Sequence, residues 1–284
     1  MLLLNIITIS GILLNSFIVA VYIQDWRRHR AVVMCDQITF IMSFINVLLQ
    51  LSLFMDGMFL LFGLYSQLPK EFFLCFLVLI FFLIDVGFWH TTWLAISYFT
   101  RLVHVSHPIF TRLKSYFPCS ALPLLLGSAT GSFLINIPYF FTTHFIIKEF
   151  ASNESDIAMY STEFHSSSIL LHLVFGCCLP LSLTLICIGL CVRSLLSHVW
   201  RMRHNRGQYS SSPQLQALVQ AAGTMILRVL LELAFSLCMT SLIATSFKMD
   251  QKTSLILWFL VVSCPTAQSI VLIMGSPRLK SRIL

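Results

Sequence analysis

Several ionisable side chains, among them Arg228, Glu232, Asp85 and His172, lie inside long apolar stretches of this sequence, where a charge is costly and therefore needs a partner or a function. Arg228 and Glu232 are four residues apart, so on a helix they share one face and are predicted to form an ion pair within that helix. A switch contact between this pair and another helix is the alternative. Asp85 could attract a cationic ligand into a water-filled cavity, or it could be a protonated core residue that is hydrogen-bonded. His172 is a lone histidine on an apolar stretch, where packing and ligand binding are both open.

Two asparagines, Asn15 and Asn46, also fall near the middle of apolar stretches. Amide side chains can hydrogen-bond across a helical bundle in a membrane, and each such contact contributes about 0.6 kcal/mol. We therefore predict that both asparagines are structural polar residues, as is the pair of Arg228 and Glu232. Trp258 lies in another such stretch and is equally compatible with a pocket position and an interfacial one.

No arrangement of residues in the sequence predicts catalysis. The metalloprotease pattern HExxH, the nucleophile pattern GxSxG and the phosphate-binding loop are all missing, and Asp85 and Glu232 share no local motif. The nine cysteines form neither a CxxC pair nor a Cys/His spacing suited to zinc. The sequence thus predicts a protein that is not an enzyme and that has no cofactor and no metal site.

The stretches that hold these residues are long enough to cross a membrane. Hydrophobic residues make up 57% of the chain and charged residues only 10%. Soluble domains carry roughly 25% charged residues, so lipid must surround most of this chain. A bilayer core takes about 20 helical residues, and the runs lack the alternation of barrel strands. We predict an all-α seven-transmembrane helix bundle that forms one domain over residues 1–284, with spans near 2–24, 37–60, 74–100, 117–143, 168–192, 224–247 and 253–275.

The positive charges in the connecting segments indicate the orientation of the bundle. With the N-terminus outside, the cytosolic segments hold thirteen lysines and arginines and the external segments hold four. Basic residues favour the cytosolic side of short loops, so this asymmetry predicts a multi-pass protein of the plasma membrane with an external N-terminus. The net charge of +7 therefore reflects the basic cytosolic segments that orient the protein in the membrane, and no nucleic-acid partner is expected. The external segment 144–167 contains Asn153-Glu154-Ser155, a sequon for N-glycosylation.

Short motifs at the cytosolic ends of the predicted helices are more specific than the composition. Four of them occur in order along the chain. The first is Gly11 to Ile18 (GILLNSFI) followed by Asp25-Trp26, and the second is Tyr98 to Lys114, which contains Ser106-His107-Pro108-Ile109-Phe110. The third is Ser194-Leu195 with His198, and the fourth is Gln268 to Lys280. Together they resemble the type 2 (bitter) taste receptors, a family of G-protein-coupled receptors. The resemblance spans all seven predicted helices, and the Ser-His-Pro-Ile-Phe segment is its most specific part.

This resemblance implies a chemosensory receptor that binds small molecules between the outer halves of its helices and activates a heterotrimeric G protein of the gustducin class. It also implies a glycosylated second external loop and no disulfide of the rhodopsin kind. Within such a receptor we expect the ligand among Ile84, Asp85, Phe88, His172 and Trp258. We expect coupling to the G protein through Tyr98, Arg101, His107, Pro108, His198 and Arg201.

The chain differs from the residues usual in that family at four positions. Asn46 stands where the family usually has arginine, Gly223 where it has lysine, and Gln268 where it has histidine. The third-span asparagine that often contacts ligands corresponds to Ile84, with Asp85 beside it. The missing arginine and lysine are parts of a network that holds the inactive state in the family.

Three other interpretations are open at this point. A vomeronasal type 1 receptor is a related chemosensory class, but the Ser-Leu-x-x-His and C-terminal motifs argue against it. A membrane transporter would need inverted repeats or a row of ionisable residues along one path, and the sequence shows neither. A folded protein that no longer signals is compatible with Asn46, Gly223 and Gln268.

Overall fold

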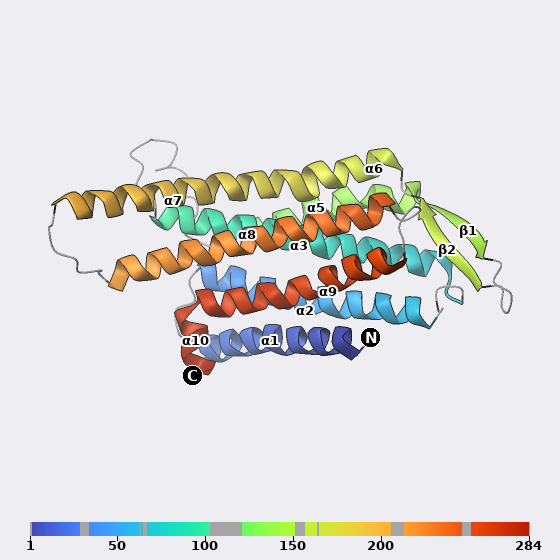
Figure 1. Cartoon of the computed structure of the whole chain (residues 1–284), viewed down its shortest axis with the longest axis horizontal. Helices are drawn as coiled ribbons and strands as arrows, with labels where there is room; N and C mark the ends of the chain where they lie inside the picture. The colour runs from blue at the N-terminus through green and yellow to red at the C-terminus, as the bar shows by residue number, and fades with distance from the viewer. Residues whose placement is uncertain are drawn as a thin grey trace.

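The protein is described here by a computed structural model, drawn in Figure 1. The structure describes residues 2–28, 34–62, 64, 67–102, 121–150, 157–163, 165–205, 213–245 and 251–283. In this part of the chain 7 helices are long and apolar enough to cross a membrane, which confirms the predicted seven-helix bundle. The chain is therefore a multi-pass membrane protein.

Helical segments make up most of the described part of the chain. In chain order they are α1 (Leu2–Arg27), α2 (Met34–Leu61), α3 (Lys70–Leu102), α5 (Leu122–Thr142), α6 (Ser166–Leu171), η2 (His172–Cys178), α7 (Leu179–Asn205), α8 (Pro213–Thr245), α9 (Gln251–Gly275) and α10 (Pro277–Ile283). Three of these, α6, η2 and α7, are continuous and together form the fifth membrane-crossing helix, Ser166–Ser194. The short helix α10 follows α9 and, at seven residues, is too short to cross a bilayer.

The two ends of the bundle carry different structures. The N-terminus lies at one end, together with a hairpin of two antiparallel strands, β1 (His144–Phe150) and β2 (Ile157–Glu163), while α10 and the C-terminus lie at the opposite end (Figure 1). The excess of basic residues assigns the α10 end to the cytosol. The hairpin was not predicted, because two short strands in a loop produce little periodic signal in a sequence dominated by apolar helices.

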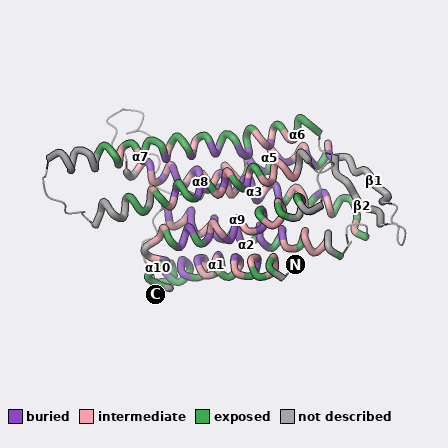
Figure 2. The backbone as a smooth tube through the Cα atoms, in the orientation of Figure 1, coloured by how far each residue is buried: buried purple, intermediate pink, exposed green. Residues whose placement is uncertain are grey.

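Many large apolar side chains are exposed on the outside of the bundle, while several polar side chains are fully buried inside it. Phe141 and Leu237 are 77% and 68% exposed, whereas Asn15, Gln50 and Asp85 are fully buried. Figure 2 shows the buried positions along the inner sides of the helices and the exposed positions along the outer sides. Lipid solvates apolar side chains but cannot satisfy amides or carboxylates, so the polar groups gather inside the bundle.

Helix α3 occupies the middle of the bundle. It packs against α2, α5, η2 and α7, while α8 packs against α7 and α9, and α1 packs against α2 and α9. This arrangement brings the polar positions of α3 close to partners from several helices. Among the polar residues of α3, Asp85, His90, Thr91 and Thr92 are all buried.

The fifth span contains a wide helical turn just before Pro180. The segment η2 is π-helical, and the backbone N–H of Leu179 donates to the carbonyl of Val174, five residues earlier. Such a wide turn brings residues five apart onto the same side, so Cys177 Sγ lies 3.9 Å from His172 Nε2. The carbonyl of Pro180 accepts hydrogen bonds from the hydroxyls of Thr184 (2.7 Å) and Thr92 (3.0 Å), which ties the turn to α3.

Candidate functional site

The external half of the bundle contains an outer cavity of about 500 Å³ between α3, the fifth span and α8. The walls are mostly apolar, with a few polar groups that could orient a small molecule. The lining includes Ile84 and Phe88 from α3, His172 and Cys177 from η2, and Ser236 and Thr240 from α8. Apolar walls with a few convergent polar groups are typical of ligand sites.

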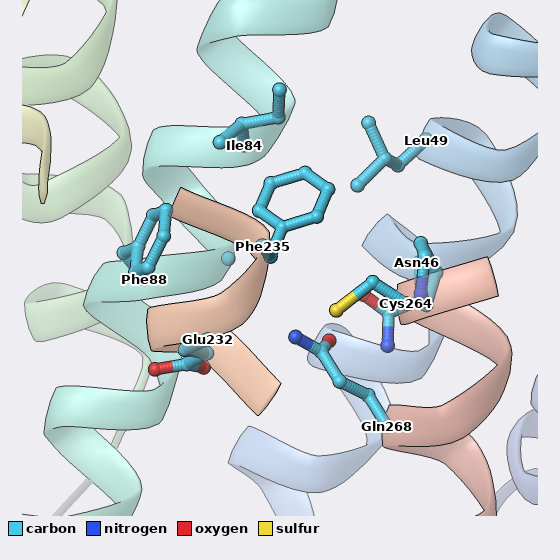
Figure 3. A pocket seen from close by; sticks show the side chains of 10 residues that line it. Asn46, Leu49, Ile84, Phe88, Glu232, Phe235, Cys264 and Gln268 are labelled. Atoms are coloured by element: carbon cyan, nitrogen blue, oxygen red, sulfur yellow. The ribbon is translucent and has the colours of Figure 1, made fainter. Parts of the chain in front are cut away.

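A second, central cavity of about 300 Å³ lies deeper and shares Ile84, Phe88 and Phe235 with the outer cavity. Figure 3 shows it from close by, with Ile84 and Phe88 on one side and the amides of Asn46 and Gln268 on the other. The central cavity is therefore more polar than the outer one.

Three of the four positions that differ from the usual family residues line the central cavity. They are Ile84, Asn46 and Gln268. Where the resemblance leads one to expect an arginine and a histidine, this chain has two neutral amides. An asparagine is shorter than an arginine, so the exchange at position 46 leaves room and removes a positive charge.

A buried polar network lies on the cytosolic side of the central cavity. The Nε of Arg228 is 3.7 Å from Oε1 of Glu232 and donates a hydrogen bond to the hydroxyl of Thr91 at 2.9 Å. That hydroxyl donates in turn to Glu232, and Nη2 of Arg228 contacts the sulfur of Met42 on α2. Arg228 and Glu232 are each 3% exposed. The pair is thus intrahelical, as its spacing predicts, and it also joins α8 to α3 and α2.

An inner cavity of about 390 Å³ follows on the cytosolic side of this network. Arg228 and Met225 of α8 line it, together with Tyr98 of α3 and Ser276 beside α10. Glu232 lines the central cavity and Arg228 lines the inner cavity, so the ion pair separates the two spaces.

A further polar cluster surrounds Asp85, which is fully buried. Its Oδ1 lies 3.3 Å from Nδ1 of His172, and its Oδ2 accepts a hydrogen bond from Nδ2 of Asn136 at 2.7 Å. The imidazole of His172 packs against the ring of Phe81 with centroids 5.3 Å apart, and edge-on against Tyr139 at 6.0 Å.

The predicted ligand residues divide into three groups in the structure. Ile84 and Phe88 line both the outer and the central cavity, and His172 lines the outer one. Asp85 lies behind His172 and contacts its ring. Trp258 packs against the apolar cluster that surrounds the cavities, but it does not line the outer, central or inner cavity.

Of the predicted coupling residues, Tyr98 lines the inner cavity. The backbones of Arg101, His198 and Arg201 belong to α3 and α7, but their side chains are not among those that the structure describes. His107, Pro108 and the sequon residue Asn153 lie outside the described residues.

The two predicted structural asparagines behave differently. Nδ2 of Asn15 donates a hydrogen bond to the carbonyl of Gly11 in its own helix at 2.9 Å, so this hydrogen bond does not connect two helices. Asn46 is 3% exposed and lines the central cavity, and its Nδ2 makes no hydrogen bond within the described part of the chain. Thr91, Asn136 and Cys177 were not predicted as site residues, because threonine, asparagine and cysteine are common in membrane helices and their partners come from distant segments.

At the cytosolic end, ion pairs join α10 to α1 and α2, and we call this group of contacts the ion-pair clamp. Arg278 of α10 places Nε 2.8 Å from Oδ2 of Asp25 on α1 and Nη1 2.8 Å from Oδ2 of Asp36 on α2. Nη2 of Arg282 lies 3.2 Å from Oδ1 of Asp25, and the hydroxyl of Tyr22 donates to Asp36 at 3.4 Å. Asp25-Trp26 and the segment from Pro277 to Lys280, two motifs far apart in the sequence, therefore meet in the structure.

Removing the clamp is expected to loosen α10. In Arg278→Ala, the buried carboxylate of Asp25 loses its 2.8 Å ion pair with Arg278, and the free energy of unfolding should fall by about 1.5–3 kcal/mol, the usual contribution of a hydrogen bond to a charged group. Thermal unfolding of the detergent-solubilised protein measures the change. Lys280→Ala, at an exposed position of the same helix, is the matched control. Equal melting temperatures for the two variants would show that the clamp does not hold α10.

These features define a class, a seven-helix transmembrane protein with cavities towards both faces and a buried ion pair between them. The chain belongs to the taste receptor protein family (TAS2R), whose model matches residues 1–284.

Individual members of the family match along nearly the whole chain. Taste receptor type 2 member 41 of Pan paniscus is 28% identical over 297 residues, which cover 99% of this chain and 92% of that receptor. Taste receptor type 2 member 40 of Gallus gallus is 25% identical over 281 residues, covering 96% and 89%. Taste receptor type 2 member 1 of Pan paniscus is 28% identical over 281 residues, covering 95% and 89%.

Proposed function

We propose that this protein is a bitter taste receptor that binds small molecules in the outer and central cavities and activates a heterotrimeric G protein of the gustducin class at its cytosolic end. Membership of the taste receptor family supports the receptor class. The observation that supports the mechanism is that two helices, α3 and α8, each line all three cavities in turn.

The path along α8 is short and continuous. Ser236 and Thr240 line the outer cavity, Glu232 lines the central cavity, and Arg228 and Met225 line the inner cavity. A helix moves as a stiff element, so a shift of its outer half is carried to its inner half. A ligand activates the receptor only if it binds one packing of α8 more tightly than the other, because equal affinity for both shifts nothing.

The cavities favour a particular ligand chemistry. The outer cavity has apolar walls with hydroxyls from Ser236 and Thr240, and the central cavity adds the amides of Asn46 and Gln268. Such a site suits a small, largely apolar molecule that carries hydrogen-bonding groups. The carboxylate of Glu232 is paired with Arg228 and that of Asp85 lies behind His172, so neither is placed to bind a bulky organic cation in the cavities.

At the cytosolic end we propose that Tyr98, Arg101, His107, Pro108, His198 and Arg201 contact the G protein. Tyr98 supports this assignment because it lines the inner cavity beside Arg228. We also propose glycosylation at Asn153, on the side of the membrane that the charge distribution assigns to the exterior.

The direct test is a calcium-release screen in cells that express the protein together with a promiscuous G protein. We expect at least one compound of a panel of bitter molecules to give a concentration-dependent signal that cells without the receptor do not show. Surface staining of the same cells shows whether the protein reaches the plasma membrane. A silent panel with normal surface staining would contradict the proposal and favour a protein that no longer signals.

A glycine in the central cavity allows the ligand site to be located. A Cβ atom at Gly87 meets no other atom within 4 Å, so the added side chain of Gly87→Val begins in open space and occupies part of the cavity. We expect the half-maximal concentration of an active compound to rise at least about tenfold, which corresponds to roughly 1.4 kcal/mol of binding energy.

The control for this variant is Gly127→Val on α5, an exposed position where a Cβ also meets nothing within 4 Å. Its dose–response curve should match that of the unmodified receptor. If Gly87→Val responds like Gly127→Val, the ligand does not enter the central cavity.

A further inference from the structure

Three side chains of the kinds that bind transition metals meet beside the outer cavity. Asp85 comes from α3, while His172 and Cys177 come from the π-helical segment η2. One potential ligand atom of each lies within 4.8 Å of the others. We propose that Asp85, His172 and Cys177 form a binding site for a divalent transition-metal ion, and that Zn²⁺ is the ion it fits best.

The donor atoms identify the type of ion. A thiolate, an imidazole nitrogen and a carboxylate oxygen are the usual ligands of Zn²⁺, whereas Mg²⁺ and Ca²⁺ prefer oxygen alone. Ligand atoms about 2.0–2.3 Å from a tetrahedral zinc ion lie roughly 3.3–3.8 Å from one another. Oδ1 of Asp85 lies 3.3 Å from Nδ1 of His172, which is the nitrogen that would bind the ion, while Sγ of Cys177 lies nearer to the other ring nitrogen, 3.9 Å from Nε2. One donor atom of each residue lies within 4.8 Å of the others, and a rotation of the Cys177 side chain towards Nδ1 of His172 would bring its Sγ to the same ion.

The charges also favour a metal ion. An ionised Asp85 and an ionised Cys177 together neutralise a divalent cation, and a neutral site is the least costly one in a bundle surrounded by lipid. The thiol proton of Cys177 is released when the metal–sulfur bond forms. Oδ1 of Asp85 and Nδ1 of His172 are within ion-pair distance, yet neither makes a hydrogen bond in the described part of the chain. A metal ion between them would use both.

The surroundings hold the three donors in place. Asn136 donates to Oδ2 of Asp85 and thereby turns Oδ1 towards His172. Gly176 leaves space for the carboxylate, because a Cβ atom there would collide with Oδ1 of Asp85. Partners that orient a ligand from behind typically change metal affinity by about 10–100-fold.

The fourth coordination position would face the outer cavity, because His172 and Cys177 both line it. Three protein ligands with one open position are the arrangement of zinc sites that accept a further molecule. The cavity also provides the route by which the ion enters. Metal binding at this site does not depend on signalling, so it can be tested without a G protein.

The experiment uses Co²⁺ as a spectroscopic probe on the purified receptor in lipid nanodiscs, with a purification tag that lacks histidine. Binding should produce a near-ultraviolet charge-transfer band, which a thiolate ligand gives and which oxygen and nitrogen ligands do not. We expect one Co²⁺ per receptor, displaced by Zn²⁺. Cys177→Ser should abolish the band, and Asn136→Ala should weaken the affinity by about 10–100-fold.

The neighbouring Cys178 provides the matched control, since it belongs to the same helical turn but is exposed. Cys178→Ser should keep the band unchanged. A second measurement needs no variant: Zn²⁺ should slow the alkylation of Cys177, but not of Cys178, in the unmodified receptor. No charge-transfer band in the unmodified protein, a band that survives in Cys177→Ser, or alkylation of Cys177 that is insensitive to Zn²⁺ would each overturn the proposal.

Discussion

Replacing Glu232 by leucine should destabilise the receptor by about 3–5 kcal/mol, because it leaves the guanidinium of Arg228 buried without its carboxylate. Arg228 is 3% exposed, and its remaining polar contacts are the hydroxyl of Thr91 and the sulfur of Met42. Neither group carries a compensating charge. The expected result is a strong loss of folded protein after detergent extraction, measured by the temperature at which the monomer peak disappears in size-exclusion chromatography.

The double variant Arg228→Met with Glu232→Leu should recover most of that loss. It removes both charges and fills the space with apolar groups, and such replacements of buried ion pairs are often neutral or stabilising. Thr91 would then lose both partners, but a helical threonine can donate to the carbonyl four residues earlier. If the double variant is less stable than Glu232→Leu alone, the pair does not act as one unit and its contacts with Thr91 and Met42 outweigh the charge.

A second large effect is expected at Gly11, where α1, α2 and α9 meet. A Cβ atom at this position would collide with the amide of Gln50 and the hydroxyl of Thr266. These two groups are hydrogen-bonded to each other at 2.5 Å, and the hydroxyl of Thr266 also donates to the carbonyl of Ile7. Gly11→Val should therefore lower the free energy of unfolding by about 1–3 kcal/mol from overpacking alone, with further loss if the buried amide of Gln50 loses its partner.

The matched control for Gly11→Val is Gly131→Val on α5, where a Cβ atom meets nothing within 4 Å. Both changes put the same branched side chain into a helix, so the difference between their melting temperatures isolates the collision. Surface expression of the two variants in cells gives an independent measurement. Similar stabilities would mean that α1 can move away from α2 and α9 at little cost.

Part of this architecture could be predicted from the sequence because lipid imposes a simple rule. Each crossing needs about 20 apolar helical residues, so the number of helices can be counted directly. The contact between Arg228 and Glu232 also follows from spacing, since residues four apart share a helix face. The link of Arg228 to Thr91 could not be predicted, because the two residues are 137 positions apart and no periodicity connects α8 to α3.

The cluster around Asp85 could not be predicted from the sequence, for a different physical reason. Asp85 and His172 could each be recognised as costly polar residues in apolar stretches, but nothing in the sequence places them next to each other. Cys177 was still harder to recognise. On an α-helix, residues five apart point in different directions, and only the π-helical turn of η2 brings Cys177 beside His172.

The π-helical turn also changes how the fifth span should be aligned with other helices. A π turn accommodates one residue more than an α turn, and each α-helical residue advances by about 100° around the axis. A helical wheel drawn through the whole span therefore assigns residues above the turn to the wrong face. Ser168 is an example: its hydroxyl lies 2.7 Å from that of Thr142 on α5, inside the bundle. A deletion of one residue within η2 would convert the wide turn into an α turn, which should leave Ser168 facing α5 and the cytosolic half of the helix where it is.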